Sequence, residues 1–150
     1  MNAIAKQFAP HYFQAVSLIG YLQPLFLLGA RLYVAWVFFA AGLTKLRDWE
    51  STLMLFEYEY AVPLLNFEFA AYLATIGEIV LPLLLISGLA TRFSAMGLTI
   101  VNIVAVISLE DIAPAAYNLH VIWGILLLQV VIFGAGFLSL DQLIKKVIKR

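Results

Sequence analysis

Four strongly polar side chains interrupt the long apolar stretches of this sequence, one in each stretch. They are Arg31, Glu78, Asn102 and Gln129. If each stretch is a helix that rises 1.5 Å per residue, all four side chains lie about 13.5–16.5 Å along the helix axes from the same end of the bundle. Four polar groups at one depth in four apolar helices predict a polar layer in the middle of a helix bundle.

Two of these groups carry opposite charges, and a charge in the middle of a bilayer costs about 2.5–3.5 kcal/mol. We therefore expect an Arg31–Glu78 ion pair, with Asn102 and Gln129 making the remaining hydrogen bonds. Such a layer either fixes how the helices pack or lines a pocket for a ligand or a proton. In the second case Arg31 and Glu78 are the catalytic candidates. The sequence alone leaves both roles open.

A second group of residues falls near one membrane surface, at the ends of the apolar stretches. Its members are Lys45, Trp49, Tyr60 and His120. Tryptophan and tyrosine at this depth are typical of an aromatic belt at the bilayer surface. The same residues also suit an aromatic headgroup such as a quinone, whose carbonyl oxygens would accept hydrogen bonds. A metal site is not expected, because no second ligand stands at HxxxH or HxxE spacing from His120.

The composition restricts the class of protein and the chemistry. Of 150 residues, 64% are apolar and only 12% are charged, which is far more apolar than a typical soluble domain. Nine Lys and Arg balance nine Asp and Glu, so net charge does not favour nucleic acid. There is no cysteine, and this excludes disulfides, thiol redox chemistry and iron–sulfur ligation by this chain.

Four membrane-spanning helices are expected to hold these residues in place, since about 20 apolar residues cross a hydrocarbon core. We predict spans at 22–43, 69–89, 93–109 and 119–138, in one all-α membrane domain that covers 1–150. The mixed polar and aromatic residues before 23 predict a short interfacial helix. The segment 49–60 is semi-polar and is expected to form a short helix at the mouth of the bundle. No cleavable signal peptide is expected, because the first apolar stretch contains Arg31 and is too long.

Lys and Arg residues are distributed unequally between the two sides of this four-span arrangement. The side with both termini carries Lys6, Arg92, Lys145, Lys146, Lys149 and Arg150, whereas the other side carries only Lys45 and Arg47. The positive-inside rule then predicts that both termini are cytoplasmic in a multi-pass protein of the inner (plasma) membrane.

Several short motifs, in this order and spacing, resemble the DoxX family of small four-helix membrane proteins. They are Arg31, the run FFAAGLTK at 38–45, Gly77-Glu78 and SGLATR at 87–92. The likeness extends over about 25–140. The run FEYEYAVP at 56–63, with Asp48-Trp49, resembles a subgroup encoded beside iron enzymes that modify copper-binding peptides.

The resemblance implies a role in a redox or metal-stress system, since the family takes its name from subunits associated with quinol oxidase and thiosulfate:quinone oxidoreductase systems. Our leading hypothesis is a quinone-linked subunit that works with a protein partner or as a homo-oligomer. Lys45 and His120 would contact the quinone, and Glu78 would relay protons. Two other classes remain open: a non-catalytic membrane anchor or assembly partner, and a transporter of small solutes or cations.

Overall fold

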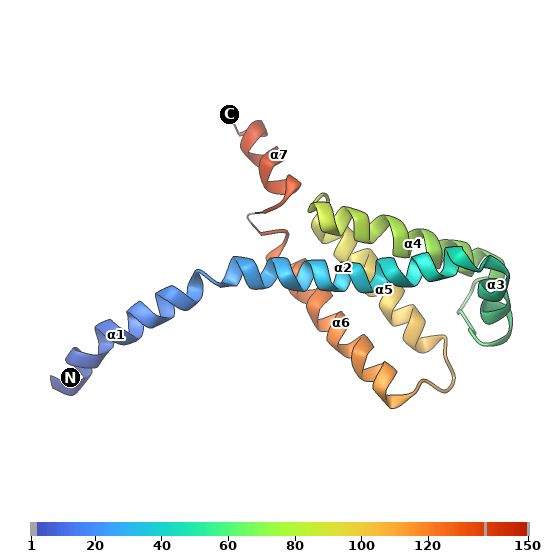
Figure 1. Cartoon of the computed structure of the whole chain (residues 1–150), viewed down its shortest axis with the longest axis horizontal. Coiled ribbons are helices and arrows are strands. Elements are labelled where there is room, and N and C mark those ends of the chain that lie inside the picture. Colours follow the sequence, from blue (N-terminus) through green and yellow to red (C-terminus); the bar gives the residue numbers. More distant parts are fainter. Residues whose placement is uncertain (1–2, 137, 150) are drawn as a thin grey trace.

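The computed structural model describes residues 3–136 and 138–149, and every regular element in these ranges is a helix. The helices are α1 (Ala3–Gly20), α2 (Gln23–Arg47), α3 (Trp49–Tyr58), α4 (Phe67–Ser87), α5 (Thr91–Ile107), α6 (Pro114–Phe133) and α7 (Leu140–Ile148). Figure 1 shows α2, α4, α5 and α6 gathered together, with α1 and α7 leaving the group at one end. The predicted all-α class is confirmed.

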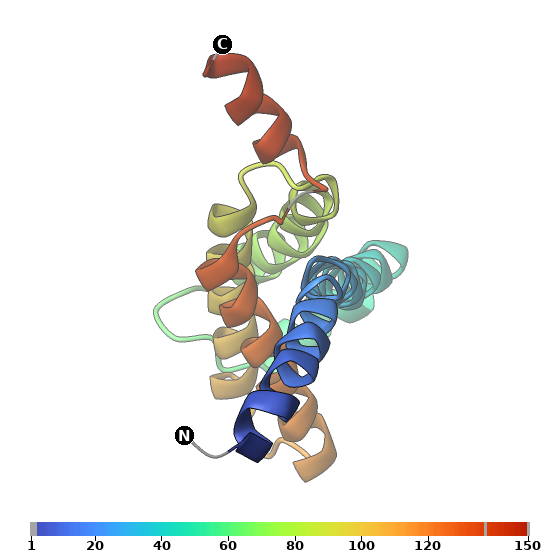
Figure 2. The same ribbon diagram turned by 90° about the vertical axis from the view of Figure 1, so that its left-hand side faces the viewer.

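Helices α2, α4, α5 and α6 form a bundle in which consecutive long helices run in opposite directions. The most extensive contacts are between α2 and α4 and between α5 and α6, and α4 also packs on α5. Figure 2 looks along α2 and shows the other three helices beside it. The core contains completely buried Val34, Ala35, Leu85, Leu98 and Leu127. Many other large apolar side chains of these helices are exposed, as expected where lipid is the solvent.

Three helical stretches are long and apolar enough to cross a membrane: Phe8–Arg47, Phe67–Ser87 and Pro114–Phe133. The fourth apolar helix, Thr91–Ile107, has 17 residues, at the short end of what a bilayer requires. The chain is therefore a membrane protein with four apolar helices, as predicted. The first stretch is 40 residues long, about twice what one crossing needs, so only part of it can span.

A turn at 21–22 divides this first stretch into α1 and α2. Figure 1 shows α1 extending away from the bundle at an angle to α2. Phe8, Tyr12 and Phe13 on α1 are about two-thirds exposed. The predicted N-terminal helix is present, while Met1 and Asn2 lie outside the described residues. Its position at the membrane surface stays a prediction.

The predicted bounds of the last span are wrong by about five residues at each end. The sequence predicted 119–138, but α6 begins at Pro114 and ends at Phe133, where Gly134 is its C-cap with a φ of 77°. Proline suits the first turn of a helix because its missing N–H has no partner there. The apolar residues at the end of the predicted span therefore belong to the connection between α6 and α7, and not to the membrane-spanning helix.

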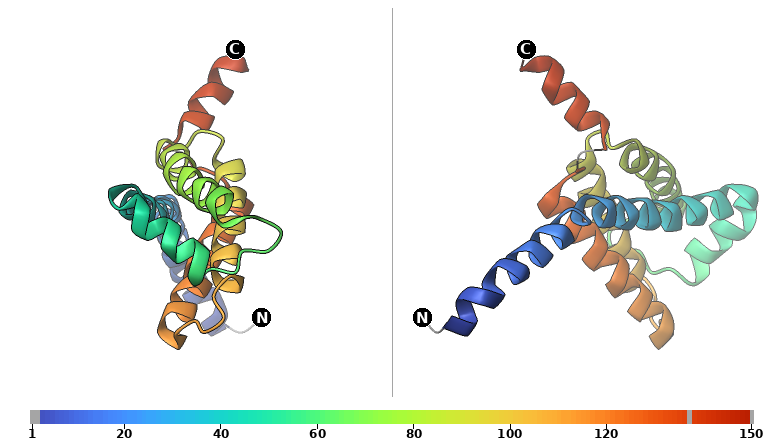
Figure 3. Two further views of the ribbon diagram at one scale, coloured as in Figure 1. Left: turned by 90° about the vertical axis from the view of Figure 1, so that its right-hand side faces the viewer. Right: turned by 60° about the vertical axis from the view of Figure 1, so that its left-hand side comes forward.

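The two short helices are held by side-chain caps. Asp48 caps α3, accepting hydrogen bonds from the Ser51 amide (3.0 Å) and hydroxyl (2.6 Å). Ser139 caps α7, which the sequence did not predict as a separate helix. Figure 3 shows α3 and α7 at opposite ends of the bundle. We call these the α3 end and the α7 end.

Asp141 joins α7 to the turn between α4 and α5. Its carboxylate accepts hydrogen bonds from the backbone N–H groups of Ala90 (2.9 Å) and Thr91 (3.0 Å) at the start of α5. Its own N–H donates to the carbonyl of Gly88 at 2.9 Å. Burial raises the pKa of Asp141, but the hydrogen bonds from Thr91 and Ala90 outweigh this effect and lower it overall. The carboxylate therefore stabilises the α4–α5 turn in its charged form.

An Asp141→Asn substitution should reduce stability at neutral pH by about 1 kcal/mol, because the amide nitrogen of Asn cannot accept the second N–H and the negative charge at the start of α5 is lost. Because the folded state lowers this pKa, the contribution is complete above the unfolded value of about 3.9 and disappears as pH falls through the folded value. Thermal unfolding in detergent, followed by circular dichroism from pH 7 to pH 2.5, should show the difference shrinking below pH 4. A difference that stays constant with pH would contradict the assignment.

Candidate functional site

Glu78 forms an ion pair with Lys45, and not with Arg31 as the sequence predicted. The Lys45 Nζ atom donates to Glu78 Oε2 at 2.6 Å, joining α2 to α4. The side chain of Glu78 is 8% exposed and that of Lys45 is 21% exposed. As expected, the buried charge of Glu78 has a partner of opposite charge. The prediction named Arg31 as this partner, whereas the structure has Lys45.

Arg31 lies at the α7 end of the bundle. Its guanidinium donates to the backbone carbonyls of Ala135 and Leu138, the latter at 2.9 Å, in the connection between α6 and α7. Gly88, the C-cap of α4, lies beside the guanidinium. The prediction failed because it measured depth from Leu22, whereas the other helices end level with Arg31. Glu78 lies ten residues before Gly88 in α4, which places it about 15 Å along the helix from the level of Arg31.

The predicted four-membered polar layer is therefore absent from the described residues. Asn102 bonds to His120, as described below, and Gln129 lies nine residues after His120 on α6, about 13.5 Å along the helix. Gln129 is half-buried. Glu78 and Asn102 each pair with a different side chain, and Arg31 bonds to backbone carbonyls at the α7 end, so the polar residues of the four spans do not form one network.

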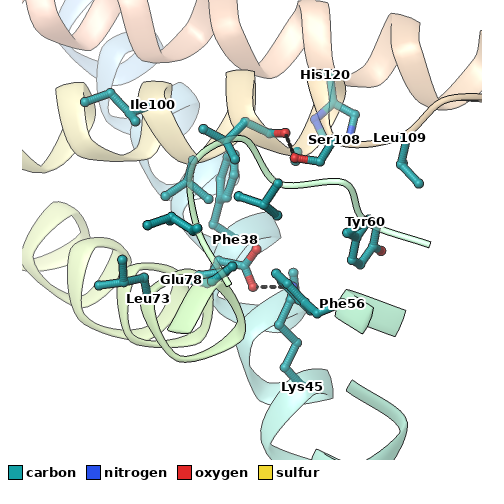
Figure 4. A pocket seen from close by; sticks show the side chains of 18 of the residues that line it. Phe38, Lys45, Phe56, Tyr60, Leu73, Glu78, Ile100, Ser108, Leu109 and His120 are labelled. Atoms are coloured by element: carbon teal, nitrogen blue, oxygen red, sulfur yellow. Dashed lines mark hydrogen bonds and ion pairs between the residues drawn. The ribbon is translucent and has the colours of Figure 1, made fainter. Parts of the chain in front are cut away.

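A cavity of about 500 Å³ opens beside the Lys45–Glu78 pair, between the four spans and the loop after α3. Its polar lining includes Lys45, Glu78, Tyr60 and His120, and most of the rest is apolar. In the view of Figure 4, the ion pair lies below, His120 above and Tyr60 to one side. Lys45, Tyr60 and His120 were predicted to lie near the membrane surface. Glu78 was predicted to lie in the middle of the bilayer, and the structure brings it to the same cavity.

The ion pair is positioned by a close approach of α2 and α4 at Gly42. A Cβ atom added to Gly42 would lie 3.0 Å from the Glu78 Cβ and 3.1 Å from its carbonyl carbon. Only glycine allows this approach, because any side chain would push the helices apart. Gly42 and Lys45 lie three residues apart on one face of α2, and this spacing places the ammonium against the Glu78 carboxylate.

Tyr60 reaches the cavity from the loop that follows α3. Its ring packs edge-to-face on Phe56 with centroids 4.9 Å apart. The next residue, Ala61, donates its N–H to the Ser108 carbonyl at 2.9 Å, which fastens the loop to the end of α5. Burial, and then the charges of Glu59 and Glu78, raise the pKa of Tyr60. Its hydroxyl therefore stays protonated and can donate a hydrogen bond.

His120 is held by a reciprocal pair of hydrogen bonds with Asn102. The Asn102 Nδ2 atom donates to the His120 backbone carbonyl at 2.9 Å, and Asn102 Oδ1 lies 2.8 Å from His120 Nδ1. With this amide orientation Oδ1 is an acceptor, so Nδ1 carries the proton. In the neutral ring, Nε2 is then an acceptor. The sequence missed this pair, although both residues were singled out separately.

Two aromatic rings complete the wall near His120. Trp123 packs edge-to-face on His120 with centroids 4.9 Å apart and on Phe38 with centroids 6.1 Å apart. Its indole Nε1 is buried and makes no hydrogen bond within the described part of the chain. Since buried donors are normally paired, this N–H is a candidate for contact with a ligand.

Trp49 is a predicted cofactor contact that lies outside the cavity lining. Its ring packs at a tilt against Tyr72 of α4, with centroids 4.7 Å apart, and fastens α3 to the bundle. Within the described ranges, no group of three or more histidine, aspartate or glutamate side chains could hold a metal ion. The site thus consists of an ion pair, a phenol and an imidazole in an apolar, aromatic enclosure.

Such a site suits a lipid-soluble molecule with a polar aromatic head. Its apolar wall would contact the ring and tail, while Lys45 and Tyr60 supply donors and His120 supplies an acceptor. A cavity of 500 Å³ falls within the range of small-molecule sites. The fold and this cavity define a small four-span membrane protein with a ligand-sized site among its helices.

The chain belongs to the DoxX family. The family profile matches residues 26–111, more than half of the chain, and this part includes Lys45, Tyr60 and Glu78. The chain is also similar to an uncharacterized protein of Haemophilus influenzae, with 38% identity over 130 residues that cover 81% of this chain and 84% of that protein. No solved structure matches the chain. The resemblance inferred from the motifs is confirmed at the level of the family.

Proposed function

We propose that this protein is the quinone-binding subunit of a membrane redox system and that the Lys45–Glu78 cavity is its quinone site. The observation that carries the proposal is a buried ion pair lining an otherwise apolar cavity. An ion pair used only to hold helices together needs no adjacent space. This one adjoins a space that also contains a phenol and an imidazole.

The cavity matches the two chemical halves of a quinone. One N–H of the Lys45 ammonium is used by Glu78, and an ammonium has three, so two can point toward a carbonyl oxygen. The Tyr60 hydroxyl is a further donor. His120 Nε2 can accept a hydrogen bond from the hydroxyl of the reduced form. Phe38, Phe56 and Trp123 line the same cavity and offer rings for packing against the quinone ring.

Reduction of a quinone to a quinol consumes two electrons and two protons. Glu78 and Lys45 hold a proton between them and can pass it to a carbonyl oxygen, with Glu78 reloaded from the mouth of the cavity. The electrons come from a partner protein that carries a redox centre, because this chain has no thiol to supply them. The protein therefore acts as a subunit, and the DoxX subgroup that resembles 56–63 suggests a metal-stress system as its setting.

The proposal places the protein in the inner membrane with both termini in the cytoplasm. Arg92, Lys145, Lys146 and Lys149 lie at the α7 end, whereas Lys45 and Arg47 lie toward the α3 end. Arg150 lies outside the described residues. The positive-inside rule assigns the α7 end to the cytoplasm, so the quinone cavity opens in the outer half of the bilayer.

Quinone binding can be tested by quenching of Trp123 fluorescence in nanodiscs. Trp36→Phe and Trp49→Phe leave Trp123, which lines the cavity, as the reporter. Decylubiquinone should quench it saturably. In this background Tyr60→Phe should weaken binding about threefold to tenfold, because one hydrogen bond to a carbonyl contributes about 0.5–1.5 kcal/mol.

The matched control is Tyr58→Phe, which removes the same hydroxyl from a side chain that is 77% exposed and close to Tyr60 in the chain. This variant should bind decylubiquinone as tightly as the background protein does. Quenching that rises linearly with quinone, and is equal in both variants, would show only quinone dissolved in the lipid. That result would reject the site.

A membrane anchor for a partner enzyme is the second candidate. It is favoured by α1, whose aromatic side chains Phe8, Tyr12 and Phe13 are exposed on a helix that extends from the bundle. Deletion of residues 1–20 should then release the partner while leaving decylubiquinone binding unchanged. The two roles are therefore separable by experiment.

A further inference from the structure

Helix α7 is amphipathic along its whole length. Its apolar side chains Leu140, Leu143, Ile144, Val147 and Ile148 follow helical spacing and are 41–79% exposed. Lys145, Lys146 and Lys149 occupy other faces. A helix with one exposed apolar face and several lysines is typical of the boundary between lipid headgroups and acyl chains.

Helix α7 begins where the bundle ends. Figure 1 and the right view of Figure 3 show α7 leaving the α7 end at a steep angle to α2 and in nearly the same direction as α6. The Asp141 hydrogen bonds to Ala90 and Thr91 fasten its first turn to the start of α5. The first turn of α7 is thus held at the level where α5 begins, while the apolar side chains of α7 stay exposed.

A second cavity, of about 630 Å³, lies at this same end, between the start of α2, the start of α5, the end of α6 and α7. Arg92 and Lys145 line it, together with the amide of Gln142. Leu27, Phe93 and Phe133 form part of its apolar wall. The cavity therefore combines cationic groups with an apolar surface at the level of the headgroups.

The charges that line this cavity do not balance. Arg92 and Lys145 contribute two positive charges and Asp141 contributes one negative charge, which leaves one positive charge. Asp141 is already bonded to two backbone N–H groups. Arg92 uses one N–H on the Ile132 carbonyl at 3.1 Å, and a guanidinium has five. One phosphate would neutralise the lining and accept the remaining hydrogen bonds.

We propose that this cavity binds the headgroup phosphate of an anionic phospholipid, between Arg92 and Lys145. The acyl chains lie along the apolar wall formed by Leu27, Phe93 and Phe133, and α7 lies in the same headgroup layer. The bound lipid joins α2, α5, α6 and α7, which meet only at this end. The proposal is independent of the quinone site at the other half of the bundle.

The site can be tested by native mass spectrometry of the full chain released from dodecyl maltoside micelles containing dioleoylphosphatidylglycerol. The protein should retain one phosphatidylglycerol, and dioleoylphosphatidylcholine should not replace it. Lys145→Gln and Arg92→Gln should each weaken binding about fivefold, the usual effect of one basic residue near an anionic surface. Because Arg92 also bonds to α6, the exposed Lys145 is the safer test of binding without a change in folding.

The matched controls are Lys146→Gln and Lys149→Gln, which remove the same charge from α7 outside the cavity. Binding by these variants should stay within about twofold of the wild type. Equal losses in all the lysine variants would show general attraction to the membrane and overturn the proposal. Displacement of the lipid by inorganic phosphate would show a site for free phosphate and would also overturn it.

Discussion

A Lys45→Met variant is expected to lose about 3–5 kcal/mol of folding stability, the usual cost of leaving one partner of a buried ion pair without the other. Glu78 is 8% exposed on its side chain, and Lys45 is the cation that bonds to it. Without Lys45, the carboxylate must either stay charged among apolar side chains or take up a proton. Reversible unfolding in detergent, followed by circular dichroism, measures the loss.

The double variant Lys45→Met/Glu78→Leu should recover most of this stability, because apolar residues of similar volume can replace a buried ion pair at little cost. Its quinone binding should nevertheless be lost. Arg47→Met is the matched control, since Arg47 is exposed near the same end of α2 and should change stability by less than about 0.5 kcal/mol. A single Lys45→Met variant as stable as the control would show that the ion pair has no structural importance.

Gly88→Ala should be similarly severe, with a loss of about 2–5 kcal/mol. Gly88 has a φ of 70°, a left-handed conformation that costs other residues about 1–2 kcal/mol. An added Cβ would also lie 2.5 Å from the Ser139 Cβ and 2.8 Å from its Cα. Relieving this clash must move α7 or the turn before α5, and overpacking of this kind costs about 1–3 kcal/mol.

Gly136→Ala is the matched control, because Gly136 has almost the same φ, 71°, but nothing within 4 Å of an added Cβ. It should show the conformational cost alone. The difference between the two variants in thermal unfolding measures how tightly the α6–α7 connection packs on the α4–α5 turn. Equal losses in both would contradict the packing described here.

Local sequence signals were enough to predict the four long helices, but not α7 or the depth of each residue. Apolar length predicted the four long helices, and the predicted bounds of α4 and α5 differ from the observed ones by about two residues. The fourth span was misplaced because its apolar run continues through Gly134 into a connection. The run itself contains no signal for its end other than that glycine.

Residue type grouped three of the residues that line the cavity, but helix register decided how the charged residues pair. Lys45, Tyr60 and His120 line one cavity, since all three lie toward the α3 end, whereas Trp49 of the same predicted group lies outside it. Their contact with a cofactor stays a prediction. Glu78 was assigned to Arg31, since a span counted from Leu22 places the two at equal depth. The contact at Gly42, which puts Glu78 beside Lys45, depends on how α2 and α4 are aligned. No single helix contains that information.

If the Lys45–Glu78 cavity holds a quinone, the quinone should be extracted together with protein purified in lipid nanodiscs. We predict about one quinone per chain, identified by absorption and mass spectrometry, in the wild type and in Arg47→Met. The stable double variant Lys45→Met/Glu78→Leu should carry none. Equal amounts of quinone in all three proteins, or none in the wild type, would show that the cavity is not a quinone site.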